Sequence, residues 1–304
     1  MTTMTYSTDN EKRLSEPTVP PHLDGSPWLM FEQQRALHIY DDLSRTLRKL
    51  AKKPSAERVH EARVVLRRWD CIWNVLEADG WSTKKYGKQV GKELKKIRHL
   101  LGTLRDCDVN IEIAESLNAP QEIIEKWLNE RKSIARKTKK ELKNLEVDKL
   151  LKRLSTFLLK RPEKLRHDFE SNGNSGADSA YNHLEPFVKA QEEIARKLAS
   201  AAQTPEELHA LRLGIKAWRY LLVEFYGLTN LQLVRAQQIL GKLNDLHRVE
   251  VLLAATGSPL ANESLSKSNE EREKLLDAFT QFRETLPYGL RPMISSIGEK
   301  LKSN

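Results

Sequence analysis

One stretch, residues 59–73, constrains the fold more than any other, because it gives a single helix two different faces. At about 100° per residue, the apolar side chains fall on one arc: Ala62, Val65, Leu66, Trp69, Ile72, Trp73 and Leu76. The opposite side carries cations, with Arg68 at its edge: His60, Arg63 and Arg67. The stretch therefore predicts a helix whose apolar arc packs against a core.

The same pattern occurs a second time, in residues 208–220. When His60 is matched to His209, Trp69 falls on Trp218, and Arg63 and Arg67 fall on two further cations, Arg212 and Lys216. Arg219 joins the cationic side of this second stretch. A second pair of segments follows in the same order, Leu-Gly-Thr-Leu-Arg-Asp at 101–106 and Leu-Gly-Lys-Leu-Asn-Asp at 240–245. Two ordered matches predict an internal repeat.

The rest of the chain also shows helical periodicity, and no alternating pattern of useful length predicts a strand. We expect an all-α protein built from two antiparallel helical bundles related by a pseudo-twofold. Polar residues 1–26 are interpreted as a disordered tail. The polar, glycine-containing segment 171–178 separates the copies and is interpreted as a linker. The first helical half is then 27–170 and the second 179–304.

The helix boundaries follow from capping residues and prolines. Thr204 should cap a helix that has Pro205 at its first position. Pro162 should end a helix that begins near residue 148, and the third helix should be interrupted at 105–108. The expected helices are 28–52, 55–79, 82–105, 109–117, 121–145, 148–159, 179–202, 205–226, 230–254, 263–286 and 288–302.

Composition favours a polyanionic partner. The 304 residues contain 51 Lys and Arg against 42 Asp and Glu, a net charge of +9. The two cysteines, Cys71 and Cys107, form no CxxC pair, which argues against a disulfide framework or a thiolate zinc site and favours a reducing compartment. There is no long apolar run and no basic, hydrophobic leader, so we expect a cytoplasmic protein without a membrane segment.

The cationic faces are the candidate binding site. His60, Arg63 and Arg67 span roughly 10 Å of helix axis, a spacing that suits a linear ligand with a charge at every unit. If the two rows converge, they form a cationic channel. Each histidine either contacts phosphate or makes a structural hydrogen bond, and the mixed Lys/Glu segment 121–146 is interpreted as a solvated face. The candidate residues are His60, Arg63, Arg67, Arg68, Lys88, Lys92, Lys95, Arg98, Arg105, His209, Arg212, Lys216 and Arg219.

These motifs resemble the CHAD family, the conserved histidine α-helical domain. The resemblance covers roughly residues 27–302 and rests on His-x-x-Arg-x-x-x-Arg-Arg at 60–68, Leu-Gly-x-Leu-Arg-Asp-x-Asp-Val at 101–109, and the weaker copies at 209 and 240. It implies two four-helix bundles around a basic cavity, binding of inorganic polyphosphate, and in some members association with polyphosphate granules. The resemblance assigns polyphosphate binding to His60, Arg63, Arg67, Arg68, His209, Arg212, Lys216 and Arg219.

The second copy departs from the first at several cations. Ala217 stands where the first copy has Arg68, and Val234, Gln237, Gln238 and Asn244 replace Lys95, Arg98, His99 and Arg105. We therefore expect the first half to dominate the affinity. Members of the family are often fused to a triphosphate-processing CYTH domain, for which these residues leave no room, so we expect neither catalysis nor a cofactor.

Three alternatives stay open. A metal-dependent phosphohydrolase would use His60 or His99 with Asp106 and Asp108. A nucleic-acid-binding protein would exploit the same charge, although Trp69, Trp73 and Trp218 lie on the apolar arcs rather than between the cations, with Tyr220 as the exception. A pure interaction scaffold is the third.

Overall fold

The computed structural model describes residues 27–78, 86–171, 185–202 and 204–283, and every regular element within them is a helix. The all-α prediction is confirmed. The expected tail 1–26, the expected starts at Ser82 and residue 179, most of the linker and the helix 288–302 lie outside the described residues. The elements are α1 (Pro27–Lys52), α2 (Ala56–Ala78), α3 (Tyr86–Ser116), α4 (Gln121–Asn144), α5 (Val147–Ser171), α6 (Glu185–Ala201), α7 (Pro205–Tyr226), α8 (Leu231–Ala254), the short 3-10 helix η2 (Pro259–Ala261) and α9 (Asn262–Arg283).

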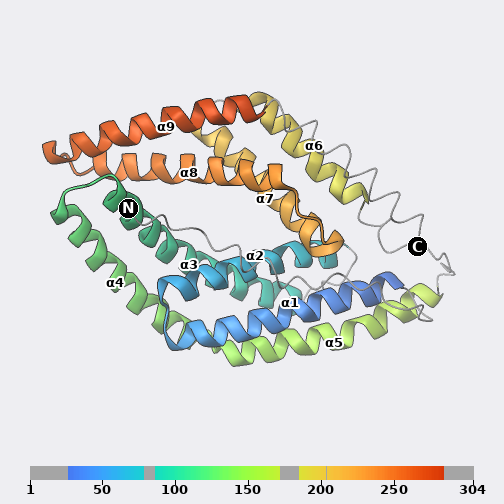
Figure 1. Cartoon of the computed structure of the whole chain (residues 1–304). Coiled ribbons are helices and arrows are strands. Elements are labelled where there is room, and N and C mark those ends of the chain that lie inside the picture. Colours follow the sequence, from blue (N-terminus) through green and yellow to red (C-terminus); the bar gives the residue numbers. More distant parts are fainter. Residues whose placement is uncertain (1–26, 79–85, 172–184, 203, 284–304) are drawn as a thin grey trace.

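The helices form two groups that meet along a central contact (Figure 1). In the first group α1 packs on α2 and α5, and α3 packs on α2 and α4. In the second group α7 packs on α6 and α8, and α8 packs on α9. The groups are joined where α2 contacts α7 and where α3 contacts α8. The helices that carry the repeated motifs are therefore the ones in contact, whereas the pseudo-twofold relation and the domain boundary remain predictions.

The apolar arc of α2 is buried, as its spacing predicts. Leu66, Trp69 and Ile72 are at most 1% exposed and belong to one large core, which also includes Ile215 and Trp218 of α7. A second, smaller core joins the end of the α3–α4 hairpin to α8 and η2. Both cores contain residues from both groups, so the contact between them is apolar as well as polar.

The start of α7 confirms its predicted cap. The Thr204 hydroxyl accepts a hydrogen bond from the N–H of Glu207, and the Glu207 carboxylate accepts one from the N–H of Thr204. This reciprocal capping box satisfies N–H groups that the first turn leaves without partners. The helix ends at Gly227, whose φ of 62° is in the left-handed region that favours glycine.

Two predicted helix interruptions are wrong. Helix α3 runs unbroken through 105–108, because buried Leu101 and Leu104 are followed at helical spacing by Ile111 and Ala114. Helix α5 likewise continues past Pro162 to residue 171. A proline lacks the N–H that would bond the carbonyl four residues earlier, here that of Leu158. Gln33 of α1 donates to that carbonyl instead, at 3.1 Å, so the helix continues without an unpaired acceptor.

Candidate functional site

Helices α2 and α7 bring the two predicted cationic rows together. Arg63 and Arg67 of α2 act electrostatically on Lys216 of α7, and Arg67 also acts on Arg212. Arg219 lies within the same reach of Lys216. None of these cations makes an ion pair with a carboxylate of the described residues. We call this group, Arg63, Arg67, Arg212, Lys216 and Arg219, the cation cluster.

Crowding and burial shift the proton affinities within the cation cluster. Burial, and then the charge of Arg67, lower the pKa of Arg63 to about 10. Burial also lowers the pKa of Arg212, whereas nearby Asp245 acts in the opposite direction. Lys216 is 9% exposed, and burial followed by the charges of the surrounding arginines lowers its pKa to about 6. The protein thus holds like charges together at a cost that an anionic ligand would offset.

Helix α3 extends this basic region beyond the cation cluster. Arg105 lies close enough to His60 that, after burial, its charge contributes to lowering the pKa of the imidazole. Gly102 leaves room for the guanidinium of Arg63, because a Cβ atom at this position would lie 3.1 Å from its Nη1. His60 itself is exposed at the end of the row. The first repeat therefore presents a histidine and an arginine side by side at the surface.

The matching histidine of the second repeat has a different neighbour. Nδ1 of His209 lies 2.6 Å from Oδ1 of Asn244, the residue that replaces Arg105, and Asn244 donates in turn to Asp245 at 3.2 Å. This bond supports the structural interpretation for His209. Arg219 donates to Gln237 at 3.0 Å, and its guanidinium lies 5.0 Å from the ring centre of Tyr220.

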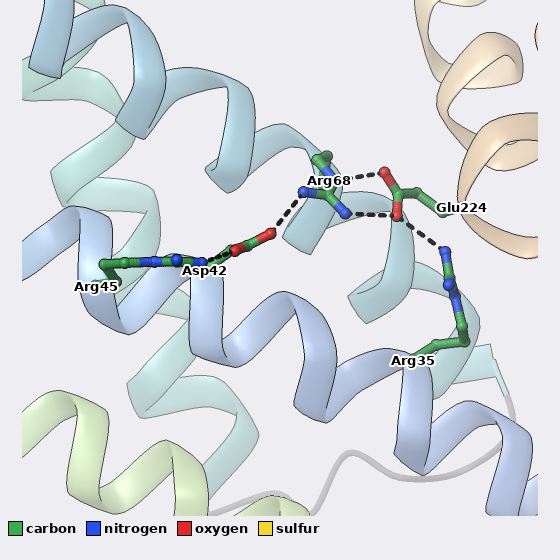
Figure 2. A network of polar contacts seen from close by, with 5 residues as sticks. All are labelled: Arg35, Asp42, Arg45, Arg68 and Glu224. Carbon is green, nitrogen blue, oxygen red and sulfur yellow. Dashed lines mark hydrogen bonds and ion pairs between the residues drawn. The ribbon is translucent and has the colours of Figure 1, made fainter. Parts of the chain in front are cut away.

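Arg68 lies in a separate network of ion pairs (Figure 2). Its Nε donates to Oε1 of Glu224 at 2.6 Å and its Nη1 donates to Asp42 at 2.9 Å. Arg35 also contacts Glu224, at 3.3 Å, and Arg45 pairs with Asp42. These carboxylates raise the pKa of Arg68 against the effect of its burial. Because its donors are already used, Arg68 links α1, α2 and α7 rather than extending the cation cluster.

The remaining predicted cations lie along α3. Arg98 pairs with Asp70 of α2, so its charge is largely neutralised. Lys88, Lys92 and Lys95 are exposed on the first turns of α3. They precede Arg105 by ten residues or more, which is about 15 Å along a helix axis. The charges that act on Arg63, Arg212 and Lys216 include none of these lysines, and their role in binding stays a prediction.

Sequence reasoning missed Arg248 of α8, which joins the halves. Its Nη1 and Nη2 lie 3.3 Å from Asp106 and Asp245 respectively, the matched aspartates of the two Leu-Gly motifs, and its Nε donates to Asn110 at 2.7 Å. The available signal was an arginine at the position that Val109 occupies in the first motif. Asp106 and Asp245 therefore share one guanidinium group across the contact between α3 and α8.

Other groups named by the alternatives also have partners in the structure. Asp108 accepts from Arg131 at 2.7 Å, so both carboxylates of the metal-site alternative contact arginines. Within the described part of the chain, no three metal-binding side chains gather. Trp69 and Trp218 are buried and Tyr220 is 8% exposed, so these rings offer no open stacking surface. None of the described helices is long and apolar enough to cross a membrane.

Comparisons with known proteins place this arrangement. A crystal structure of the CHAD domain from the plant Ricinus communis is similar with a TM-score of 0.64 and 18% identity, over 91% of this chain and 96% of that one. PptA from Streptomyces chartreusis is similar with a TM-score of 0.54 and 15% identity, over 83% and 98%. A comparison with curated proteins gave no match. The CHAD domain model matches residues 34–254, and the protein therefore belongs to the CHAD domain family.

Proposed function

We propose that this protein binds inorganic polyphosphate without catalysing a reaction on it. The ligand lies along the cation cluster, with His60 and Arg105 as further contacts at the end that α3 provides. The observation that carries the proposal is the convergence of cations from α2 and α7 with no carboxylate ion pair among the described residues. The motifs that resemble the CHAD family imply the same ligand.

The chemistry of the cation cluster favours a flexible chain of phosphates. Guanidinium groups provide forked, permanently charged donors for phosphate oxygens. Arg63 and Arg67 lie one helical turn apart, as do Arg212 and Lys216, so successive donors meet successive phosphates. Such contacts release counterions and give salt-sensitive binding without base recognition. We therefore expect polyphosphate to bind more tightly than RNA or ATP. We also expect the protein to locate to the cytoplasm, at polyphosphate granules where these form.

The test is calorimetric titration with long-chain polyphosphate, inorganic phosphate, ATP and RNA at two salt concentrations. Arg63→Ala combined with Arg67→Ala removes two charge-assisted contacts worth about 1.5–3 kcal/mol each. We expect at least a hundredfold weaker polyphosphate binding, since about 1.4 kcal/mol corresponds to tenfold. Far-ultraviolet circular dichroism should be unchanged.

The matched control replaces two exposed lysines of α4, Lys139→Ala with Lys143→Ala, and should change the affinity by less than threefold. Equal losses in both double variants would mean that only diffuse charge matters. RNA that displaces polyphosphate would favour the nucleic-acid alternative. Phosphate release from polyphosphate with Mg²⁺ or Mn²⁺, abolished by Asp106→Ala, would overturn the non-catalytic assignment.

A further inference from the structure

Lys216 is the one amine of the cation cluster, and its surroundings consist of guanidinium groups. Arg212 precedes it by one turn on α7 and Arg219 follows it by nearly one turn, while Arg63 and Arg67 face it from α2. The side chain is 9% exposed, and no hydrogen bond or ion pair to it exists among the described residues. An amine differs from these guanidinium groups in one respect, because it readily gives up its proton when it is buried beside other cations.

This environment leaves the amine of Lys216 mostly uncharged near neutral pH. Burial and the four surrounding arginines lower its pKa to about 6 in the free protein. A bound chain of phosphates would reverse the second effect, since an anion within about 4–6 Å favours the charged form of an amine. Lys216 is thus expected to be neutral in the free protein and protonated in the complex with polyphosphate.

We propose that Lys216 takes up a proton when polyphosphate enters the cation cluster, so that binding strengthens as the solution becomes more acidic. This inference rests on the proposed function and names the regulation of the same site. At pH values between the pKa of Lys216 in the free protein and its pKa in the complex, one proton is taken up for each polyphosphate chain that binds. In that range the affinity falls by up to tenfold for each unit by which the pH rises.

Other titratable groups near the cluster also have shifted pKa values. Burial raises the pKa of Asp70, on which the charge of Arg67 also acts, to about 6, and proton uptake by Asp70 would persist in K216R. Burial and the charges of Arg105, Arg67 and Arg63 lower the pKa of His60 below its usual 6.5, so its own response belongs to more acidic solution. Asp106 and Asp245 pair with Arg248. Long chains reduce the contribution of the ligand, because only the terminal phosphates titrate near neutrality.

The test measures proton uptake by calorimetry at pH 8 in Tris and in HEPES, two buffers with different ionisation enthalpies. The wild type should take up about one proton per binding event, whereas K216R and K216M should take up almost none. K216R is the sharper variant, because it keeps a permanent charge at the position that Arg67 occupies in the first repeat. The α4 control, Lys139→Ala with Lys143→Ala, should retain the uptake of the wild type. From pH 7 to pH 8 the affinity should fall several-fold in the wild type and stay nearly constant in K216R.

Uptake that persists in K216R, or a wild type that takes up no proton, would overturn the inference while leaving polyphosphate binding intact. Absence of polyphosphate binding in the wild type would refute the proposed function and the inference together. The amine can also be followed without ligand, by ¹³C NMR of reductively methylated protein in which the Lys216 signal is assigned by its loss in K216R. A midpoint near 6 supports the inference, and an ordinary lysine midpoint near 10.4 refutes it.

Discussion

The matched histidines of the two repeats have different neighbouring residues. Both histidines are exposed, but His60 of the first repeat lies beside Arg105, whereas Nδ1 of His209 in the second is hydrogen bonded to Asn244. Gly102 has Arg63 against it, whereas a Cβ atom at the matched Gly241 would meet nothing within 4 Å. The first motif thus places a cation beside its histidine, and the second bonds one ring nitrogen of its histidine within the protein.

A second pair of matched positions, on α2 and α3 in the first repeat and on α7 and α8 in the second, leaves a cation without a described carboxylate partner in the second repeat only. In the first repeat Asp70 of α2 neutralises Arg98 of α3. At the matched positions of the second repeat, Arg219 of α7 bonds the neutral Gln237 of α8 and keeps its charge. The second half therefore loses a cation at Asn244 and gains one at Arg219. That the first half contributes more to the affinity for polyphosphate remains a prediction, and Arg105 is the residue on which it now mainly rests.

The largest effects should come from the matched tryptophans, which the two repeats treat alike. Trp69 is 1% exposed and Trp218 is 3% exposed. Truncation of either to alanine should lower the free energy of unfolding by about 3–5 kcal/mol, because it leaves a cavity in the core. Urea denaturation of both variants measures this. A loss below 1 kcal/mol for one of them would show that the repeats do not share their packing.

A difference between the repeats should appear at Arg68 and its match, Ala217. Arg68→Ala leaves the carboxylate of Glu224, which is 1% exposed, with Arg35 alone. We expect a loss of about 3 kcal/mol in the free energy of unfolding. Ala217 is exposed, and Ala217→Arg should change the stability by less than about 0.5 kcal/mol.

The paired change Arg68→Met with Glu224→Leu separates the buried charge from lost packing. It should cost less than Arg68→Ala alone, since no unpaired carboxylate remains in the interior. If Arg68→Ala left stability unchanged but weakened polyphosphate binding a hundredfold, Arg68 would belong to the binding site after all.

Exchange at the α3 and α8 positions tests the asymmetry directly. Arg105→Asn should weaken polyphosphate binding about tenfold, the effect of one charge-assisted contact. Asn244→Arg adds a cation but breaks the bond to His209, so we expect a gain of less than threefold. Calorimetric titration of both variants provides the comparison. A larger effect at Asn244 than at Arg105 would reverse the predicted order of the halves.

The smallest effects on binding should come from substitutions of Arg219 and Arg98. Arg219→Gln removes a charge without a carboxylate partner and should weaken binding about fivefold, close to 1 kcal/mol. Arg98→Gln removes a charge that Asp70 already neutralises and should change binding by less than twofold. Equal effects in the same titration would mean that the ion pair with Asp70 opens when the ligand binds.

Much of the fold was predictable because its causes are local. The apolar arc of α2 and the cap at Thr204 involve residues within a few turns of one another, and both were predicted correctly. The interruption at Pro162 was wrong because the group that compensates for the proline, Gln33, lies 125 residues away from Leu158. Periodicity contains no information about such a partner.

The site shows the same division. Two matching motifs predicted that Arg63 and Arg212 have equivalent places in their repeats. That the two arginines lie near one another depends on the contact between α2 and α7, which the motifs do not contain. The network around Arg68 could not be predicted, because Glu224 lies 156 residues away and has no counterpart in the first repeat. On one helix face Arg67 and Arg68 are equivalent as cations, and only the tertiary structure assigns one to the cluster and the other to Glu224.

Arg248 has a consequence for the contact between α3 and α8. Without its guanidinium, the carboxylates of Asp106 and Asp245 would lie near one another with no cation between them. Like charges so placed repel, and the apolar contact around them would have to overcome that repulsion. The junction between the two groups of helices therefore depends on a charge that the first Leu-Gly motif lacks, since Val109 stands at the matched position.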